Sequence, residues 1–169
     1  MTMIEIYQVD NVDRLEQARI LWREYAEFLK NCFHERVELP SFKEYFKNYE
    51  QEIANHLPGR FGPPKGCLLL AKNKRKPAGC VGLMDLGNNI CEMRRLFVRP
   101  QYRGFGIGRA LAEAIVEQGR NMDYSSMRLN TNRRMPEAKK LYLSLGFTEI
   151  EPYENFEVDG MIFMELKLV

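Results

Sequence analysis

The stretch Cys91–Arg109, CEMRRLFVRPQYRGFGIGR, decides how the rest of the chain is interpreted. It begins as a strand-like run, breaks at Arg99-Pro100, and passes through glycines at alternate positions, Gly104, Gly106 and Gly108. From Ile107 onward apolar residues recur at three- and four-residue steps, which predicts an amphipathic helix. The stretch therefore predicts a strand, a glycine-rich turn and a helix, in that order.

A glycine-rich turn that opens a helix predicts an anion site. The first backbone N–H groups of a helix have no partner inside it, and the helix dipole adds about half a positive charge there. Glycine lets the backbone approach a ligand closely, because it has no Cβ. We therefore interpret the turn as a pyrophosphate cradle. An ordinary turn between a strand and a helix is the alternative.

The glycine spacing argues against two common nucleotide sites. The pattern is G-x-G-x-G, whereas a dinucleotide fold has G-x-G-x-x-G and an acidic residue about 20 residues further on. A P-loop needs Lys-Ser/Thr after its last glycine, and here Arg109-Ala110 follows Gly108. A nucleotide-phosphate enzyme is therefore disfavoured.

Two further patterns link the stretch to a known family. Gln101-x-x-Gly104-x-Gly106, within Arg103-Gly-Phe-Gly-Ile-Gly108, resembles the acyl-CoA signature of the GNAT superfamily of N-acyltransferases. Downstream, Glu137-Ala138-x-x-Leu141-Tyr142-x-x-Leu145-Gly146-Phe147 resembles the second signature of that superfamily. Residues 91–98 and 152–168 resemble a bacterial-type subgroup. The resemblance covers most of residues 57–169 and implies an acetyl-CoA-dependent N-acetyltransferase.

The resemblance also implies where coenzyme A binds. The 103–109 loop would hold the pyrophosphate, and the backbone of the strand before it would hold the pantetheine arm where that strand splays from its neighbour. The implied residues are Leu96, Phe97, Val98, Arg103, Gly104, Phe105, Gly106, Ile107, Gly108 and Arg109. For Arg103 and Arg109, solvated surface positions are the alternative. Many members carry Asn where this chain has Met135, and Asn130 is the expected replacement contact, with Asn132 the alternative.

Two residues are candidates for proton transfer. Tyr142 matches the family tyrosine that donates a proton to the departing sulfur, although from its spacing alone it is one more residue of an apolar helix stripe. An amine with a pKa of ~10.4 arrives protonated and needs a base. Glu92 is the candidate base, acting through a water, and a surface carboxylate is its alternative. Glu92 shares strand parity with Leu96 and Val98 unless a bulge intervenes.

Length and composition suit one enzyme domain over residues 1–169. The 25 basic and 23 acidic side chains nearly balance, so neither a nucleic acid nor a membrane partner is expected. No run approaches the ~20 apolar residues of a membrane span, and no signal segment precedes the first strand, so a cytoplasmic location is expected. The four cysteines lack metal-ligand spacing and are interpreted as reduced core thiols, with no metal site.

The periodicity along the chain predicts an α/β fold of order βααβββαβαββ, the GNAT fold, with a mixed, mostly antiparallel sheet flanked by helices. Strands are expected at 3–9, 67–71, 77–86, 90–98, 126–130, 147–150 and 161–168. Helices are expected around 15–29, 42–49, 106–120 and 136–145. Aromatic residues at helical spacing, Phe42, Tyr45, Phe46 and Tyr49, favour core packing. In the family, however, the first two helices wall the acceptor pocket.

The acceptor is the part that the sequence constrains least. The carboxylates Glu149, Glu151, Glu154, Glu157 and Asp159 occur with no Lys or Arg between them. A solvated acidic loop is the simpler interpretation, and a negative lip that attracts a cationic amine is the sharper hypothesis. The overall prediction is transfer of acetyl from acetyl-CoA to a primary amine of a small molecule or peptide, by a monomer or homodimer. A non-catalytic acyl-CoA sensor is the alternative.

Overall fold

The computed structural model describes residues 3–169. The strands are β1 Ile4–Gln8, β2 Cys67–Asn73, β3 Lys76–Gly87, β4 Ile90–Val98, β5 Ser126–Asn132, β6 Thr148–Ile150 and β7 Met161–Lys167. The helices are α1 Val12–Cys32, α2 Pro40–Asn55, α3 Ile107–Asn121 and α4 Pro136–Ser144. This order confirms the predicted βααβββαβαββ. Short 3-10 turns at 34–36, 59–61 and 100–102 were not predicted.

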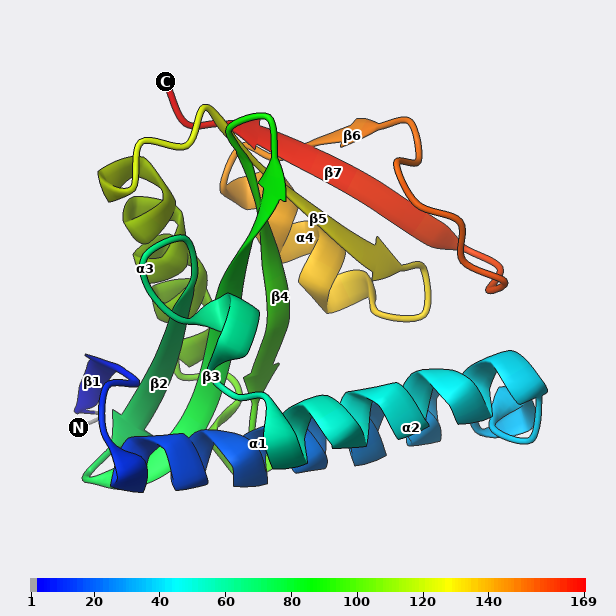
Figure 1. The fold of residues 1–169 in the computed structure, drawn as a ribbon, viewed down its shortest axis with the longest axis horizontal. Helices are drawn as coiled ribbons and strands as arrows, with labels where there is room; N and C mark the ends of the chain where they lie inside the picture. The colour runs from blue at the N-terminus through cyan, green and yellow to red at the C-terminus, as the bar shows by residue number, and fades with distance from the viewer. Residues whose placement is uncertain (1–2) are drawn as a thin grey trace.

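The strands form one sheet in the order β1-β2-β3-β4-β5-β7-β6 (Figure 1). Neighbouring strands run antiparallel except β4 and β5, which run parallel because α3 returns the chain to the other end of the sheet. The prediction of a mixed, mostly antiparallel sheet is therefore confirmed.

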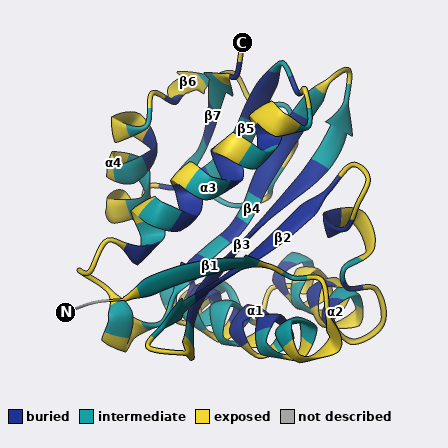
Figure 2. Cartoon of the chain, turned by 90° about the vertical axis from the view of Figure 1, so that its left-hand side faces the viewer, coloured by how far each residue is buried: buried dark blue, intermediate teal, exposed yellow. Residues whose placement is uncertain are grey.

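Each face of the sheet has its own apolar core. On one face α3 and α4 pack their apolar stripes against the strands, and on the other face α1 and α2 do so (Figure 2). The first core contains Ile107, Leu111, Ile115, Met127 and Phe147. The second contains Trp22, Ile53, Phe61, Leu70 and Phe97. Helices on both faces explain why β2 and β3 are buried along most of their length.

Strands β4 and β5 separate soon after they meet. They pair only at Ile90↔Ser126, Cys91↔Met127 and Glu92↔Arg128. Beyond these positions β4 continues to Val98 and β5 to Asn132 without pairing, and the two strands diverge (Figure 1). The splay that the family resemblance implied is present, and it opens the middle of the sheet.

A bulge at Arg95 changes which face the residues of β4 present. The register with β3 shifts by one residue between Gly82↔Arg94 and Cys80↔Phe97, and Arg95 has φ +59°. Before the bulge the odd-numbered residues Cys91 and Met93 pack toward α3. After the bulge the even-numbered residues Leu96 and Val98 do so. The shared parity of Glu92 with Leu96 and Val98 was expected only without a bulge, and it does not hold because the bulge puts an extra residue between them.

The cysteines are free thiols throughout the described residues. Cys67, Cys80 and Cys91 are buried, and burial raises the pKa of Cys67 to about 11. Cys32 is an exception to the predicted core placement, because it lies half-buried at the end of α1 and lines the cleft described below. Within residues 3–169 no helix has the length and apolarity needed to cross a bilayer, and no cluster of three or more potential metal ligands occurs.

Candidate active site

The divergence of β4 and β5 opens into a cleft of about 850 Å³. It brings together most of the residues predicted to bind coenzyme A, and Tyr142 with them: Leu96, Phe97, Val98, Arg103, Gly104, Gly106, Ile107, Gly108, Arg109, Asn130 and Tyr142. Among the described residues, two predicted positions do not line it. Phe105 has a side chain that points to solvent at 54% exposure, and Glu92 is fully buried behind the wall.

The glycine-rich turn presents bare backbone at the start of α3. Gly106 is the residue before the first helical turn, and both it and Gly104 have φ +83°, a conformation that favours glycine. A Cβ built at either position would meet no atom of the described chain within 4 Å. No side chain of the described residues caps this helix start. The open space and the unpaired N–H groups fit an anionic group such as a pyrophosphate.

Backbone groups of β4 face the open middle of the sheet. The N–H of Arg99 donates to the carbonyl of Ala78 on β3, so alternation turns the polar groups of Val98 toward the open edge. Arg103 reaches this edge, because its Nε donates to the Val98 carbonyl at 3.0 Å. Its guanidinium also lies 5.0 Å from the ring centre of Phe28. Arg103 is therefore tied to β4 and α1.

Arg109 is likewise held by protein groups. Its NH1 donates to Ser144 Oγ at 2.8 Å, and its Nε lies 2.9 Å from Glu113. The structure places both predicted arginines along the cleft, and it gives each of them a partner in the protein. A contact of Arg103 or Arg109 with phosphate stays a prediction.

Tyr142 joins the apolar core to the cleft. Its ring packs edge-on against Phe147 with the ring centres 5.9 Å apart, and it belongs to the core cluster under α3. Its hydroxyl has no hydrogen-bond partner among residues 3–169, while its ring lines the cleft. Burial raises the pKa of Tyr142 well above its usual range. The hydroxyl is therefore protonated near neutral pH and is available as a proton donor in the cleft.

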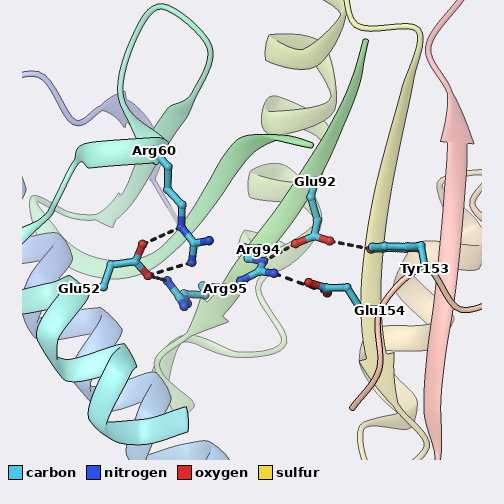
Figure 3. A network of polar contacts seen from close by, with 7 residues as sticks. All are labelled: Glu52, Arg60, Glu92, Arg94, Arg95, Tyr153 and Glu154. Carbon is cyan, nitrogen blue, oxygen red and sulfur yellow. Dashed lines mark hydrogen bonds and ion pairs between the residues drawn. The ribbon is translucent and has the colours of Figure 1, made fainter. Parts of the chain in front are cut away.

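Glu92 is the centre of a buried polar network rather than a surface carboxylate (Figure 3). One carboxylate oxygen accepts a hydrogen bond from Arg94 Nε, and the other accepts one from the Tyr153 hydroxyl at 2.7 Å. Burial first, and then the Glu92 charge, raise the pKa of Tyr153. Arg94 and Tyr153 thus lie between Glu92 and its surroundings, so a proton from the cleft can reach Glu92 only through a relay.

A second network anchors the bulge of β4 to α2. Arg95 NH1 donates to Glu52 Oε1 at 2.7 Å, and Arg60 Nε donates to Glu52 Oε2 at 2.7 Å (Figure 3). The Arg95 guanidinium lies 4.3 Å from the ring centre of Tyr49 and 4.5 Å from that of Trp22. Burial raises the pKa of Glu52, but hydrogen bonds and charges from both arginines outweigh it and leave the pKa lowered.

Comparison with known proteins identifies the family. Residues 18–147 match the model of the acetyltransferase (GNAT) family. The chain belongs to the GNAT family. A fission yeast relative, an uncharacterized N-acetyltransferase of Schizosaccharomyces pombe, is 37% identical over 73% of this chain and 76% of its own. The N-acetylaspartate synthetase of Xenopus tropicalis is 38% identical over 58% of this chain and 36% of its own.

Solved structures of GNAT proteins share the fold. A GNAT acetyltransferase from Staphylococcus aureus superposes with a TM-score of 0.70 at 22% identity, over 99% of this chain and 100% of its own. The PaiA N-acetyltransferase of Thermoplasma acidophilum, in complex with coenzyme A, gives 0.68 at 19% identity, over 98% and 99%. Membership in this family makes the protein an acetyl-CoA-dependent acyltransferase. Binding of coenzyme A at the glycine turn and the sheet opening stays a prediction.

The expected GNAT asparagine position is occupied by Met135, which lines the cleft. Of the two candidate replacements, Asn132 is already used inside the protein: its Nδ2 donates to the Asp159 carbonyl at 2.8 Å, and its Oδ1 accepts from the Arg134 N–H at 3.0 Å. Asn130 lines the cleft. The structure therefore favours Asn130, and its contact with coenzyme A stays a prediction.

Several cleft residues were not singled out by the sequence as site residues. Aromatic residues from α1, α2 and the segment after β6 form one wall, together with Arg94 and Arg134; the aromatics are Tyr25, Phe28, Tyr45 and Phe156. The family resemblance implied that the first two helices wall the acceptor pocket. Tyr45 is exposed and lines the cleft instead of packing in the core, and a contact with the acceptor stays a prediction. For Arg94 the usable signal was its two-residue spacing from Glu92 on a strand.

The acidic segment 149–159, which begins within β6, is less negative than its sequence suggests. Cations from elsewhere in the chain lie against three of its five carboxylates: Lys139 is 2.7 Å from Glu149, Arg94 is 3.7 Å from Glu154, and Arg36 is 3.4 Å from Asp159. Because these partners come from distant parts of the sequence, the local absence of Lys and Arg did not reveal them.

Proposed function

We propose that this GNAT protein transfers the acetyl group of acetyl-CoA to a primary amine of a small molecule or peptide, and that residues 1–169 act as one domain. The observation that carries the proposal is the arrangement of one continuous cleft. The glycine-rich start of α3, which has no side-chain cap among the described residues, lines it together with Tyr142 and an open strand edge. The buried carboxylate of Glu92 lies behind its wall.

Binding is assigned to two groups of residues. Backbone N–H groups from Gly104 to Arg109 would hold the pyrophosphate, and the free edge of β4 from Leu96 to Val98 would pair with the pantetheine arm. When bound, acetyl-CoA supplies the acyl group and the thiolate leaving group. The divergence of β4 and β5 supports this assignment, because an extended amide-bearing chain can pair where a neighbouring strand is missing.

Tyr142 is assigned as the general acid. In acyl transfer the amine nitrogen bonds to the acyl carbon, the carbon–sulfur bond breaks, and the sulfur takes a proton. The Tyr142 hydroxyl is protonated at neutral pH, as a tyrosine with the usual pKa of ~10 would be, and burial favours this form further. No protein acceptor among residues 3–169 occupies its proton. It would donate that proton to the sulfur and recover one from solvent through the open cleft.

Glu92 is assigned as the final acceptor of the amine proton. Its carboxylate is already the acceptor of hydrogen bonds from Tyr153 and Arg94, so it is positioned as the end of a relay. Tyr153 does not line the cleft, so water between the cleft and its hydroxyl would have to pass the proton inward. One proton would move from water to tyrosine and another from tyrosine to Glu92.

The structure gives less support to a particular charge on the acceptor than to the cleft itself. A cationic amine attracted by the segment after β6 stays a hypothesis, supported by the exposed Glu151 and Glu157. The pairing of Glu149, Glu154 and Asp159 with basic side chains weakens that attraction. A cytoplasmic location and a monomeric or homodimeric state stay predictions from the sequence.

Thiol release from acetyl-CoA, measured across a panel of amines, amino acids and peptides, tests the proposal. An enzyme of this kind should release thiol in proportion to acetylated amine. A non-catalytic sensor would bind acetyl-CoA and release no thiol with any acceptor. Turnover by the unmodified protein together with its loss in Tyr142→Phe would support the proposal; acetyl-CoA binding without turnover of any amine would favour the sensor.

A further inference from the structure

We infer that the amine acceptor carries a carboxylate next to its amine, as a free α-amino acid does, and that Arg94 binds this carboxylate. The inference rests on the proposed transfer to an amine and names the class of acceptor. Three observations support it: most N–H donors of Arg94 have no hydrogen-bond partner among residues 3–169, aromatic residues line the same cleft, and Arg94 lies two positions from Glu92.

Arg94 lines the cleft and keeps N–H donors that have no hydrogen-bond partner among the described residues. Its side chain is 19% exposed and lines the cavity. Of its five N–H donors, the one on Nε is used by Glu92. The terminal NH2 lies 3.7 Å from Glu154, which is beyond hydrogen-bond distance. An arginine in this state offers the planar fork of donors that a carboxylate accepts in a paired geometry.

The neighbouring Arg95 does not offer the same site. Its NH1 is committed to Glu52 at 2.7 Å. Its buried Nε has no partner, but the guanidinium lies over the rings of Tyr49 and Trp22, which hold it in the core beneath α1 and α2. Of the two adjacent arginines that line the cleft, Arg94 is therefore the one presented to a ligand.

The surroundings strengthen an interaction with Arg94. The Arg94 side chain is 19% exposed, and the cleft that it lines also contains the aromatic residues Tyr25, Tyr45 and Phe156. A charged pair at a largely buried side chain interacts more strongly than one at the open surface. An uncharged amine without a carboxylate would leave the free donors of Arg94 without an ionic partner.

Glu154 occupies the outer side of the guanidinium only loosely. It is 40% exposed, and its pKa is raised by partial burial and by the nearby charge of Glu92. Ionised Glu154 is thus held less favourably than a fully solvated glutamate, and at 3.7 Å it makes no hydrogen bond with Arg94. A carboxylate brought by the acceptor would replace Glu154 and approach Arg94 within hydrogen-bond distance.

The spacing of Arg94 and Glu92 sets the shape of the acceptor. The two residues are separated by one residue on β4 and share a face, so their Cα atoms lie about 6–7 Å apart. Their side chains converge, since Arg94 Nε donates to Glu92. The carboxylate receptor and the proposed proton acceptor are thus neighbours. An acceptor that uses both must carry its amine and carboxylate close together, and an α-amino acid carries them on one carbon.

The test compares three acceptors that differ only at the carboxylate: a free amino acid, its amide and the amine that lacks the group, such as alanine, alaninamide and ethylamine, repeated over a panel of side chains. Concentrations are corrected for the unprotonated fraction of each amine. For the best side chain, kcat/KM for the amino acid should exceed that for its amide by about 10- to 100-fold, as expected for a charge-assisted hydrogen bond.

Two variants identify the residue responsible. Arg94→Gln should bring the ratio of kcat/KM for amino acid over amide close to one. Any effect of the change on Glu92 cancels in this ratio, because both acceptors use the same proton acceptor. Glu154→Gln removes a competitor at an exposed position and should raise the ratio. If Arg94→Gln does not fold, Arg94→Lys is measured instead and should lower the ratio.

The outcomes separate the two proposals. A ratio near or below one in the unmodified protein, or better turnover of polyamines than of any amino acid, overturns the inference and leaves amine acetylation standing. An unchanged ratio in Arg94→Gln also overturns it. Release of no thiol with any acceptor, while coenzyme A still raises the melting temperature, rejects the proposed function and the inference with it. In that case the coenzyme site alone would stand.

Discussion

Glu92 and Leu96 lie four positions apart on one strand, yet they face opposite sides of the sheet. In a regular strand they would share a face. The bulge at Arg95, with its positive φ and one-residue register shift, inverts the alternation between them. The same strand therefore directs the Glu92 carboxylate into the polar network before the bulge. After the bulge, the residues with the same even numbering, Leu96 and Val98, pack toward α3.

The first prediction concerns the backbone at this bulge. Arg95→Ala should destabilise the protein by about 3 kcal/mol, because it breaks a buried ion pair and removes the stacked guanidinium. Arg95→Gly should be less destabilising than Arg95→Ala by about 1 kcal/mol, because glycine adopts φ +59° without strain. Denaturant unfolding measures both values.

The control for this prediction lies two residues away on the same strand. Met93 has an ordinary strand conformation, so Met93→Gly should be less stable than Met93→Ala by about 0.5–1 kcal/mol. The difference between the glycine and alanine variants therefore has the opposite sign to that expected at Arg95. The same order of glycine and alanine at both positions would show that the bulge is not a source of strain.

Acid stability depends on Glu52 in a predictable direction. The net lowering of its folded-state pKa below the usual 4.5 means that its ionic contacts stabilise the fold above about pH 4.5. This contribution is lost as the pH falls through the lowered pKa. Glu52→Gln should therefore reduce the free energy of unfolding at pH 7 and reduce it less at pH values below 4.5. Urea denaturation across the pH range measures the difference.

An exposed carboxylate provides the reference for this experiment. Glu117→Gln on α3 removes a surface partner of Arg120, and should change the free energy of unfolding by less than about 1 kcal/mol at any pH. An equal loss at acid and neutral pH in Glu52→Gln would mean that packing, rather than charge, accounts for the role of Glu52.

The coenzyme loop can be tested with two matched glycines. Gly106→Glu places a carboxylate in the proposed pyrophosphate space and should abolish coenzyme A binding by occlusion and charge repulsion. Gly87 in the β3–β4 turn has nearly the same φ, +86° against +83°, and the same open space at its Cβ position within the described chain. Gly87→Glu should therefore carry equal backbone strain and keep normal binding in isothermal titration calorimetry.

Tyr142→Phe separates chemistry from packing, since it removes only a hydroxyl that has no protein partner among residues 3–169. We expect kcat to fall by about 10²–10⁴ with little change in coenzyme A affinity or melting temperature. Single-turnover measurements ensure that the chemical step is observed. Unaltered single-turnover rates would return Tyr142 to a purely structural role beside Phe147.

Ligand selectivity provides a further check on the family assignment. Acetyl-CoA at a hundredfold excess over its Kd should stabilise the fold by about 2.7 kcal/mol, whereas ATP and NAD at the same concentrations should not. Thermal denaturation reports the shifts. A comparable shift with ATP would contradict the conclusion drawn from the glycine spacing.

The sequence predicted the elements well because their signals are local. Glycines before Ile107 and the apolar stripe of α3 define a helix start regardless of what packs on it. The strand ends moved by one or two residues, as at β5, which continues to Asn132 instead of ending at Asn130. Such ends depend on pairing with β7, which no local pattern records.

The candidate site was predicted unevenly for the same reason. The glycine turn lies in the cleft as predicted, because its conformation depends on its own glycines, and its contact with coenzyme A stays a prediction. The environment of Glu92 depends on Tyr153, which is 61 positions away, and no local pattern announced the bulge at Arg95 that follows Arg94. The ion pairs of the acidic segment 149–159 could not be predicted either, because Lys139 and Arg36 reach it from other elements.

The divergence of β4 and β5 places two unpaired strand edges inside a seven-stranded sheet. Free edges ordinarily invite other chains to add strands, and proteins protect them with charges, bulges or covering elements. Here the edges are recessed in a cleft between α1 and α4, and the Arg95 bulge and the Arg103 side chain both interrupt β4. The architecture that exposes backbone to a narrow cosubstrate thereby also limits aggregation through that edge.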